Sequence, residues 1–326
     1  MTPKKRESLK RMSTKDGLIA ALAIDQRGSL KKMLGNINRN KNDSKDIIQF
    51  KKMVSSELTP YSSAILLDPE YGLPAAKARA INTGLLVAYE KTGYDTTEPG
   101  RMPDLLADWS VKRLKELGAD SVKFLLYYDV DEDSAINDKK QAFIERIGSE
   151  CAAEELPFFC ELVSYDAHNN DTTSTSYAKI KPHKVIEMMR EFSKPRYQID
   201  VLKVEVPVNM NYVEGFADEH EIVYSRKEAL ELFKMQSDIT NLPYIFLSAG
   251  VTSKLFQETL FFAHEAGAQF NGVLCGRATW RGGVEPFAKF GDAAGKEWFN
   301  TIGKQNIESL NDTLAKTATS WFDKVQ

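Results

Sequence analysis

The sequence predicts a (β/α)8 barrel, or TIM barrel, in which eight parallel strands alternate with helices. Three observations predict it: eight short apolar runs recur along the 326 residues, helix-like segments separate most of them, and no linker or composition break divides the chain. Strands that alternate with helices favour a parallel sheet, because parallel neighbours need long crossovers. Eight units favour closure of the sheet, and an open doubly wound sheet is the alternative. We expect one domain over residues 1–326, with a charged N-terminal segment at about residues 1–16.

Each expected strand is an apolar run that leads into polar or glycine residues. The eight runs are Gly17–Asp25, Ser63–Asp68, Gly84–Glu90, Ser121–Asp129, Pro157–Asp166, Asp200–Val206, Pro243–Gly250 and Asn271–Gly276. The second and third units fit the pattern least well, because Leu73–Ile81 is a short helix and Tyr89-Glu90-Lys91 interrupts the third run.

The expected helices carry apolar residues at three- and four-residue spacing. Ile47–Leu58 has this spacing, and Ser44 is a plausible cap for the helix. Leu105–Leu117 has it as well, and Pro103-Asp104 is expected to open that helix. Thr252-Ser253 follow the seventh run and are typical of a helix start.

Composition excludes several classes of protein. The chain has 43 basic and 46 acidic residues, a net charge of −3, and therefore lacks the basic surplus typical of nucleic-acid binding. No run approaches the roughly 18–20 apolar residues of a membrane span. Only Gly17–Ala20 would form the apolar region of a secretion signal, which needs roughly 7–15 residues. We therefore expect the charged start of the chain to be a solvated segment that leads into the first strand.

The three cysteines, Cys151, Cys160 and Cys275, are few and lack Cys-x-x-Cys spacing. They cannot form a disulfide framework without leaving one cysteine over. The sequence therefore predicts a protein of a reducing compartment, the cytoplasm.

Charged residues occur inside strands that should be apolar. Lys123, Glu161 and Lys203 lie in the fourth, fifth and sixth runs, and Glu205 follows on the same face as Lys203. Asp25 ends the first run. A closed barrel has no sheet edge and its outer face is covered by helices, so each charge needs a partner or a function. Catalytic groups of this fold lie at the carboxyl ends of the strands.

These charges suggest imine (Schiff-base) chemistry on a carbonyl substrate. A lysine amine is nucleophilic only when neutral, and neutrality is favoured by desolvation or by a neighbouring cation. Lys203 with Lys123 nearby meets both conditions if both side chains point inward. Glu161, between them, would carry protons. A structural cluster of salt bridges is the alternative interpretation.

The last two strands end in a pattern typical of phosphate binding. Ser248-Ala249-Gly250 ends the seventh run ahead of a helix start, and Gly276-Arg277 ends the eighth. In this fold a phosphate often binds at these two loops, held by backbone N–H groups and a helix N-terminus. Plain turns are the alternative.

Metal chemistry has little support in the sequence. The four histidines, His168, His183, His220 and His264, are dispersed without the spacing of a metal site. Asp166, His168 and Asp171 form the one candidate group, which we interpret as a polar loop. No P-loop, Gly-x-Gly-x-x-Gly or Gly-x-Ser-x-Gly motif is present.

At these residues the sequence resembles the tagatose 1,6-bisphosphate aldolase family, class I aldolases of Gram-positive bacteria. The matching segments are Ala20–Gly28, Leu66–Pro74, Val122–Asp129, Val201–Asn209, Leu247–Val251 and Asn271–Trp280. They span nearly the whole chain. The resemblance implies a (β/α)8 barrel that cleaves D-tagatose 1,6-bisphosphate to dihydroxyacetone phosphate and D-glyceraldehyde 3-phosphate. It also implies a place in lactose and galactose catabolism, with no metal and no organic cofactor.

The resemblance further implies roles for individual residues. Lys203 would form the imine and Glu161 would be the principal acid and base, while Asp25 and Lys123 would contact the reacting part of the sugar. The C1 phosphate would lie on residues of the last two loops. These residues are Ser248, Ala249, Gly250, Gly276 and Arg277. Gln26 is expected to contact the substrate as well, and Arg27 is the candidate for the second phosphate.

Two alternatives stay open. The enzyme could instead cleave fructose 1,6-bisphosphate or a related ketose phosphate, because tagatose and fructose bisphosphates differ only at C4. The barrel could also be a metabolite-sensing regulator. We expect a phosphosugar as the small-molecule partner, no nucleic-acid or membrane partner, and a homo-oligomer, since related barrels often assemble.

Overall fold

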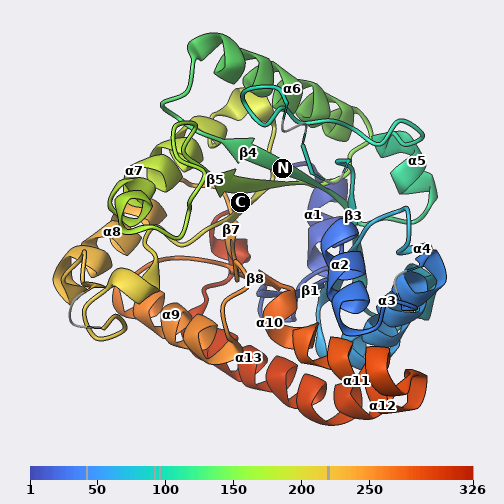
Figure 1. The fold of residues 1–326 in the computed structure, drawn as a ribbon. Helices are drawn as coiled ribbons and strands as arrows, with labels where there is room; N and C mark the ends of the chain where they lie inside the picture. Colours follow the sequence, from blue (N-terminus) through green and yellow to red (C-terminus); the bar gives the residue numbers. More distant parts are fainter. Residues whose placement is uncertain (42, 92, 95–96, 219–220, 326) are drawn as a thin grey trace.

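A computed structural model describes residues 1–325 of the chain, apart from 42, 92, 95–96 and 219–220. Eight parallel strands pair in chain order, and β1 pairs with β8 to close a barrel (Figure 1). The strands are β1 (Ile19–Ala23), β2 (Ala64–Leu67), β3 (Gly84–Ala88), β4 (Ser121–Tyr128), β5 (Phe158–Ser164), β6 (Val201–Val204), β7 (Tyr244–Leu247) and β8 (Gly272–Cys275). The predicted fold is confirmed, and the open sheet is excluded.

Most helices form a ring outside the strands, and the first helix lies against the amino ends of the strands instead (Figure 1). The helices are α1 (Pro3–Arg11), α2 (Gly28–Ile37), α3 (Ser44–Leu58), α4 (Leu73–Ala78), α5 (Val111–Glu116), α6 (Ser134–Ala153), α7 (Thr175–Phe192), α8 (Arg226–Asp238), α9 (Ser253–Glu265), α10 (Arg277–Trp280), α11 (Val284–Phe290), α12 (Asp292–Trp298) and α13 (Lys304–Thr317). Within the described residues, no helix is both long and apolar enough to cross a membrane.

Two predicted helix starts are wrong. α5 begins at Val111 and not at Pro103-Asp104, because Leu105 forms an antiparallel bridge with Glu90 and Ser110 caps the helix. The cap of α3 is Asp43, whose side chain accepts the Asp46 N–H at 2.9 Å. Ser44 is therefore the first helical residue.

Strand residues alternate between two hydrophobic clusters. One set points outward and packs under the helices, and the other fills the barrel interior. The interior set includes small residues, Ala23 of β1 and Ala88 of β3. Small side chains at these positions leave interior volume for the long side chain of Lys123, which is also fully buried.

The two ends of the chain lie together at the amino ends of the strands. Leu9 and Met12 of the N-terminal segment are 0% exposed and join the interior cluster with Trp321. Trp321 donates from Nε1 to Ser13 Oγ at 2.8 Å. The expectation of a solvated N-terminal segment is therefore wrong for its apolar residues. Leu9 and Met12 are buried and close the barrel at the amino ends of the strands.

Candidate active site

Two lysines and a glutamate meet inside the barrel near the carboxyl ends of its strands. The Glu161 carboxylate lies between the two ammonium groups, with Oε1 2.7 Å from Lys203 Nζ and Oε2 3.0 Å from Lys123 Nζ. All three side chains are at most 12% exposed. The structure thus brings together the charges that the sequence placed on three neighbouring strands, and it puts Glu161 within proton-transfer distance of Lys203.

Strand register explains this arrangement. Glu161 of β5 is the partner of Lys203 of β6, so both side chains start from one layer of the barrel. Lys123 of β4 is the partner of Phe159, two residues before Glu161, and therefore starts one layer deeper. Its side chain extends toward the carboxyl ends of the strands and meets Glu161 there.

Lys123 also binds carboxylates that follow two other strands. Its Nζ lies 2.7 Å from Asp25 Oδ2, beyond β1, and it contacts Glu90 Oε1, beyond β3. Glu90 was not among the predicted site residues. It stands two residues after Ala88, in phase with the inward side of β3, and a charge in that phase is the signal that would have found it.

The surrounding charges keep two of these carboxyls ionised. Burial would raise the pKa of Asp25, but the ammonium groups of Lys123 and Lys203 outweigh it and hold that pKa well below its usual range. Burial would also raise the pKa of Glu161, and the same two cations lower it instead. Both carboxylates are therefore proton acceptors at neutral pH.

The pKa values of the other two groups in the cluster, Glu90 and Lys123, are raised. Burial raises the pKa of Glu90 in spite of its contact with Lys123. Burial would lower the pKa of Lys123, but Asp25, Glu161 and Glu90 together raise it well above its usual value. Lys123 is thus a permanent cation with no nucleophilic character. The predicted repulsion between Lys123 and Lys203 stays a prediction.

A cavity of about 560 Å³ opens above this cluster at the carboxyl ends of the strands. Lys203, Glu161, Asp25 and Gln26 line it. Gln26 Oε1 is buried and has no hydrogen-bond partner within the described part of the chain. A buried acceptor without a partner is unusual, and a ligand hydroxyl in the cavity would satisfy it.

The predicted phosphate loops form one wall of the same cavity. The wall residues are Ser248, Ala249 and Gly250 after β7, and Gly276 and Arg277 after β8. Gly250 has a φ of +81°, and a Cβ there would lie 3.1 Å from the Arg277 guanidinium. Glycine therefore allows the guanidinium to pack against the turn. A guanidinium beside a glycine turn and a helix start suits a phosphate group.

Two further arginines line the cavity. Arg27 is 4% exposed, and its guanidinium contacts Glu70 and donates to the Glu90 carbonyl at 2.8 Å. Arg101 was not among the predicted site residues, because it lies on the long segment between β3 and α5 where no periodicity marks it. Its guanidinium stacks 4.2 Å from the ring centroid of Tyr165. Arg27 is therefore already engaged by a carboxylate. Arg101 instead lies over tyrosine rings and donates from Nη2 to Asn170 Oδ1 at 2.9 Å, and no carboxylate among the described residues pairs with it.

Glu205, two residues after Lys203, also lines the cavity. Its carboxylate accepts hydrogen bonds from the backbone N–H of Ser164 at 2.7 Å and from Ser164 Oγ at 2.6 Å. Lys181 of α7 lies 3.4 Å away. These contacts tie the end of β6 to β5 and α7, and they fix the strand segment that carries Lys203.

The three histidines that the structure describes, His168, His183 and His264, do not assemble into a metal site. Within the described residues, no group of three or more His, Cys, Asp or Glu side chains is arranged to hold a metal. His168 belongs to a turn in which Asp166 Oδ1 accepts its backbone N–H at 3.0 Å. His220 lies outside the described residues.

Comparison with known proteins gives close relatives over the full length. Residues 19–282 match the model of the DeoC/LacD family aldolases. The tagatose 1,6-diphosphate aldolase 2 of Enterococcus faecalis (strain ATCC 700802 / V583) is 65% identical over 326 residues, which cover 100% of this chain and 98% of the relative. The tagatose 1,6-diphosphate aldolase of Lactococcus lactis subsp. lactis is 58% identical over 325 residues, covering 100% and 99%.

Solved structures share the fold at low identity. A fructose-bisphosphate aldolase from Plasmodium falciparum superposes with a TM-score of 0.71 at 14% identity, covering 97% of this chain and 95% of that one. An archaeal fructose-1,6-bisphosphate aldolase, solved with its catalytic lysine bound to a carbinolamine intermediate, gives 0.59 at 15% identity, covering 95% and 98%.

Proposed function

The chain belongs to the DeoC/LacD aldolase family, and from this premise we propose that it cleaves D-tagatose 1,6-bisphosphate to dihydroxyacetone phosphate and D-glyceraldehyde 3-phosphate. It is a class I aldolase, an aldehyde-lyase that works through a Schiff base. The observation that carries the mechanism is the Glu161 carboxylate 2.7 Å from Lys203 Nζ inside a closed barrel. The full-length identity to tagatose 1,6-diphosphate aldolases supports the choice of sugar.

Imine formation starts with a proton transfer. Glu161, held ionised by the two lysines, takes a proton from Lys203 and leaves a neutral amine. The amine attacks the C2 carbonyl of the sugar to form a carbinolamine. Protonated Glu161 then returns its proton to the C2 hydroxyl, which leaves as water, and a protonated imine remains.

Cleavage uses the imine as an electron sink. Asp25, also ionised, accepts the proton of the C4 hydroxyl, and the C3–C4 bond breaks. The bonding pair moves to the imine and forms an enamine, while C4 leaves as the aldehyde of glyceraldehyde 3-phosphate. Protonation at C3 and hydrolysis of the imine release dihydroxyacetone phosphate and restore Lys203. Lys123 holds Asp25 and Glu161 in place throughout.

The phosphates fix the sugar along the cavity. The C1 phosphate binds at the turn from Ser248 to Gly250 and at Arg277, close to the lysine that attacks C2. We assign Arg101 to the second phosphate in place of Arg27, because Arg27 would have to give up Glu70 first.

A coupled cleavage assay with both sugars, measured side by side, tests the proposal. Tagatose 1,6-bisphosphate should be cleaved, and fructose 1,6-bisphosphate serves as the comparison because it differs only at C4. A much higher kcat/KM for fructose 1,6-bisphosphate would replace the assigned substrate. Tight binding of either sugar without turnover would favour the sensor alternative.

Metal independence is a second test of the class I assignment. The protonated imine supplies the positive charge that a Lewis-acid metal would otherwise provide. Exhaustive chelation should therefore leave kcat within about twofold of its starting value, measured with and without added zinc. Loss of activity on chelation, with recovery on zinc addition, would overturn the Schiff-base mechanism.

We further propose that the enzyme acts in the cytoplasm, in lactose and galactose catabolism, as a homo-oligomer with no nucleic-acid or membrane partner. Cys151, Cys160 and Cys275 are all free and buried, which suits a reducing compartment. Sedimentation equilibrium of the purified chain tests the oligomeric state, and a single species at 36.7 kDa would exclude a stable oligomer.

A further inference from the structure

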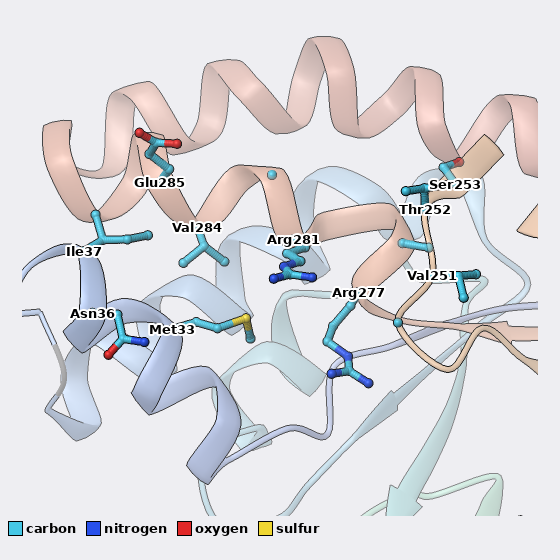
Figure 2. A pocket seen from close by; sticks show the side chains of 13 residues that line it. Met33, Asn36, Ile37, Val251, Thr252, Ser253, Arg277, Arg281, Val284 and Glu285 are labelled. Carbon is cyan, nitrogen blue, oxygen red and sulfur yellow. The ribbon is translucent and has the colours of Figure 1, made fainter. Parts of the chain in front are cut away.

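A groove of about 540 Å³ adjoins the substrate cavity on its outer side. It lies between α2, the start of α9 and the segment from α10 to α11 (Figure 2). Gly250 and Arg277 line both the groove and the cavity. The groove is thus a second space that shares one guanidinium with the site assigned to the C1 phosphate.

Two arginine side chains, Arg277 and Arg281, project into this groove (Figure 2). Within the described residues, no carboxylate lies within salt-bridge distance of either guanidinium. Glu285, the acidic residue of the described lining, is paired with Lys289 at 2.5 Å. The groove therefore holds two positive charges without a counter-ion from the protein.

The other side of the groove is apolar. Met33 and Ile37 of α2 and Val284 of α11 face the space, and Asn36 adds one amide (Figure 2). Ile37 is 37% exposed, so part of this surface meets solvent. A ligand that fits the lining would carry anionic groups at one side and a carbon body at the other.

We propose that this groove binds a small organic diphosphate, with one phosphoryl group on Arg277, the other on Arg281, and its carbon body against Met33, Ile37 and Val284. Guanidinium groups bind phosphate oxygens through paired N–H donors, and a diphosphate can use both arginines at once. The site is separate from the imine site. This proposal depends on the proposed function in one respect, which is that Arg277 also binds the C1 phosphate of the sugar.

The shared arginine has a consequence for the reaction. An occupant of the groove and the C1 phosphate compete for Arg277, so each weakens the binding of the other, and this coupling is reciprocal. A diphosphate in the groove should therefore raise the KM for the sugar and leave kcat unchanged.

The experiment uses inorganic pyrophosphate as the probe and inorganic phosphate as its comparison. Calorimetric titration of the full chain gives their affinities without any turnover, and the cleavage assay gives KM and kcat. The variants are Arg281→Ala, Arg281→Lys and Ile37→Glu, which places a negative charge at the rim of the groove. Arg146→Ala is the control, because Arg146 is an exposed residue of α6 on a different part of the ring.

We expect Arg281→Ala and Ile37→Glu each to weaken pyrophosphate binding about tenfold, with Arg281→Lys recovering part of the loss. Phosphate binding and the KM for the sugar should change less than about twofold in Arg281→Ala, and Arg146→Ala should match the wild type.

Equal pyrophosphate affinity in the wild type and Arg281→Ala would place the probe in the substrate site alone and overturn the proposal. A parallel rise of KM in Arg281→Ala would also overturn it, by making Arg281 a substrate residue. Failure to cleave the sugar with pyrophosphate binding as expected would overturn only the proposed function.

Discussion

Lys123 and Lys203 are both buried in the same cluster, yet their contacts give them different chemistry. Lys123 contacts Asp25, Glu90 and Glu161, whereas Lys203 lines the cavity and, among the residues that the structure describes, pairs with Glu161 alone. An ammonium enclosed by three carboxylates is held in its charged form and cannot attack a carbonyl. The number of carboxylates in contact therefore distinguishes the proposed nucleophile, Lys203, from the fixed cation, Lys123, more clearly than burial does.

Borohydride reduction in the presence of dihydroxyacetone phosphate tests this assignment. The covalent adduct should form on the peptide that contains Lys203, and Lys203→Ala should abolish it. Lys123→Ala should still form it, more slowly at neutral pH than at high pH, because a protonated Lys203 is less disfavoured without the neighbouring charge. Peptide mass spectrometry locates the adduct. An adduct on Lys123 would reverse the two roles, and none at all would remove the imine.

Arg277 should matter for substrate binding more than for chemistry. Its guanidinium packs against the Gly250 turn and has no carboxylate to neutralise it within the described residues. Arg277→Ala should weaken binding by about 2 kcal/mol, the low end for losing a charge pair because the residue is half-buried, and raise KM roughly thirtyfold. Arg277→Lys should recover part of this, since a point charge lacks the paired donors. An alanine variant with unchanged KM would contradict the phosphate assignment.

Helix α3 is attached to the barrel by a buried ion pair close to the active site. Lys51 of α3 contacts Asp68, which follows β2, and both side chains are 0% exposed. Lys51 also donates to the Ile24 carbonyl at 2.9 Å, directly before Asp25. The pair therefore fixes both the helix and the segment after β1 that carries Asp25.

Breaking this pair should destabilise the fold strongly. Lys51→Met leaves the Asp68 carboxylate buried without its cation, and we expect a loss of about 3–5 kcal/mol in the free energy of unfolding. Lys51→Met with Asp68→Asn should recover part of it, because the uncompensated charge is gone. Urea denaturation measures both. The control is Lys234→Met, whose partner Asp238 is 59% exposed, and it should cost less than about 1 kcal/mol. Equal losses for Lys51→Met and Lys234→Met would contradict the structural role.

The sequence predicted the strands better than the segments between them. Apolar runs with inward charges located Asp25, Lys123 and Lys203, because period-two alternation in a closed barrel makes a charge conspicuous. Glu90 carried the same signal but stands between Tyr89 and Lys91, which together interrupt the third apolar run. Arg101 had no signal, since its place depends on a long loop and on Tyr165, which directly follows β5. Local spacing cannot report contacts of that kind.

The chain as a whole should lose stability on acidification through its central cluster. The folded pKa values of Asp25 and Glu161 lie below the unfolded values of about 3.9 and 4.3. Their contribution is therefore complete above those unfolded values and is lost as pH falls through the folded ones. Glu90 has the opposite sign, because its raised pKa makes the folded state bind its proton more tightly. Lys123, with a raised pKa, contributes fully below its unfolded pKa of about 10.4, and the contribution is lost as pH rises from there through the folded pKa.

The loss of stability at low pH can be assigned to particular carboxylates by comparing two asparagine variants in urea denaturation from pH 7 down to pH 2. In the wild type the midpoint should fall most steeply below about pH 4, where Asp25 and Glu161 are protonated more readily in the unfolded chain. Asp25→Asn should have a lower midpoint than the wild type at pH 7. Its free energy of unfolding should also fall less steeply on acidification, by up to about 1.4 kcal/mol for each pH unit over which the folded and unfolded wild type differ by one bound proton. Asp312→Asn, which changes an exposed carboxylate of α13, should run parallel to the wild type. Parallel curves for the wild type and Asp25→Asn would mean that the acid sensitivity lies outside the cluster, and that the two lysines do not hold Asp25 ionised.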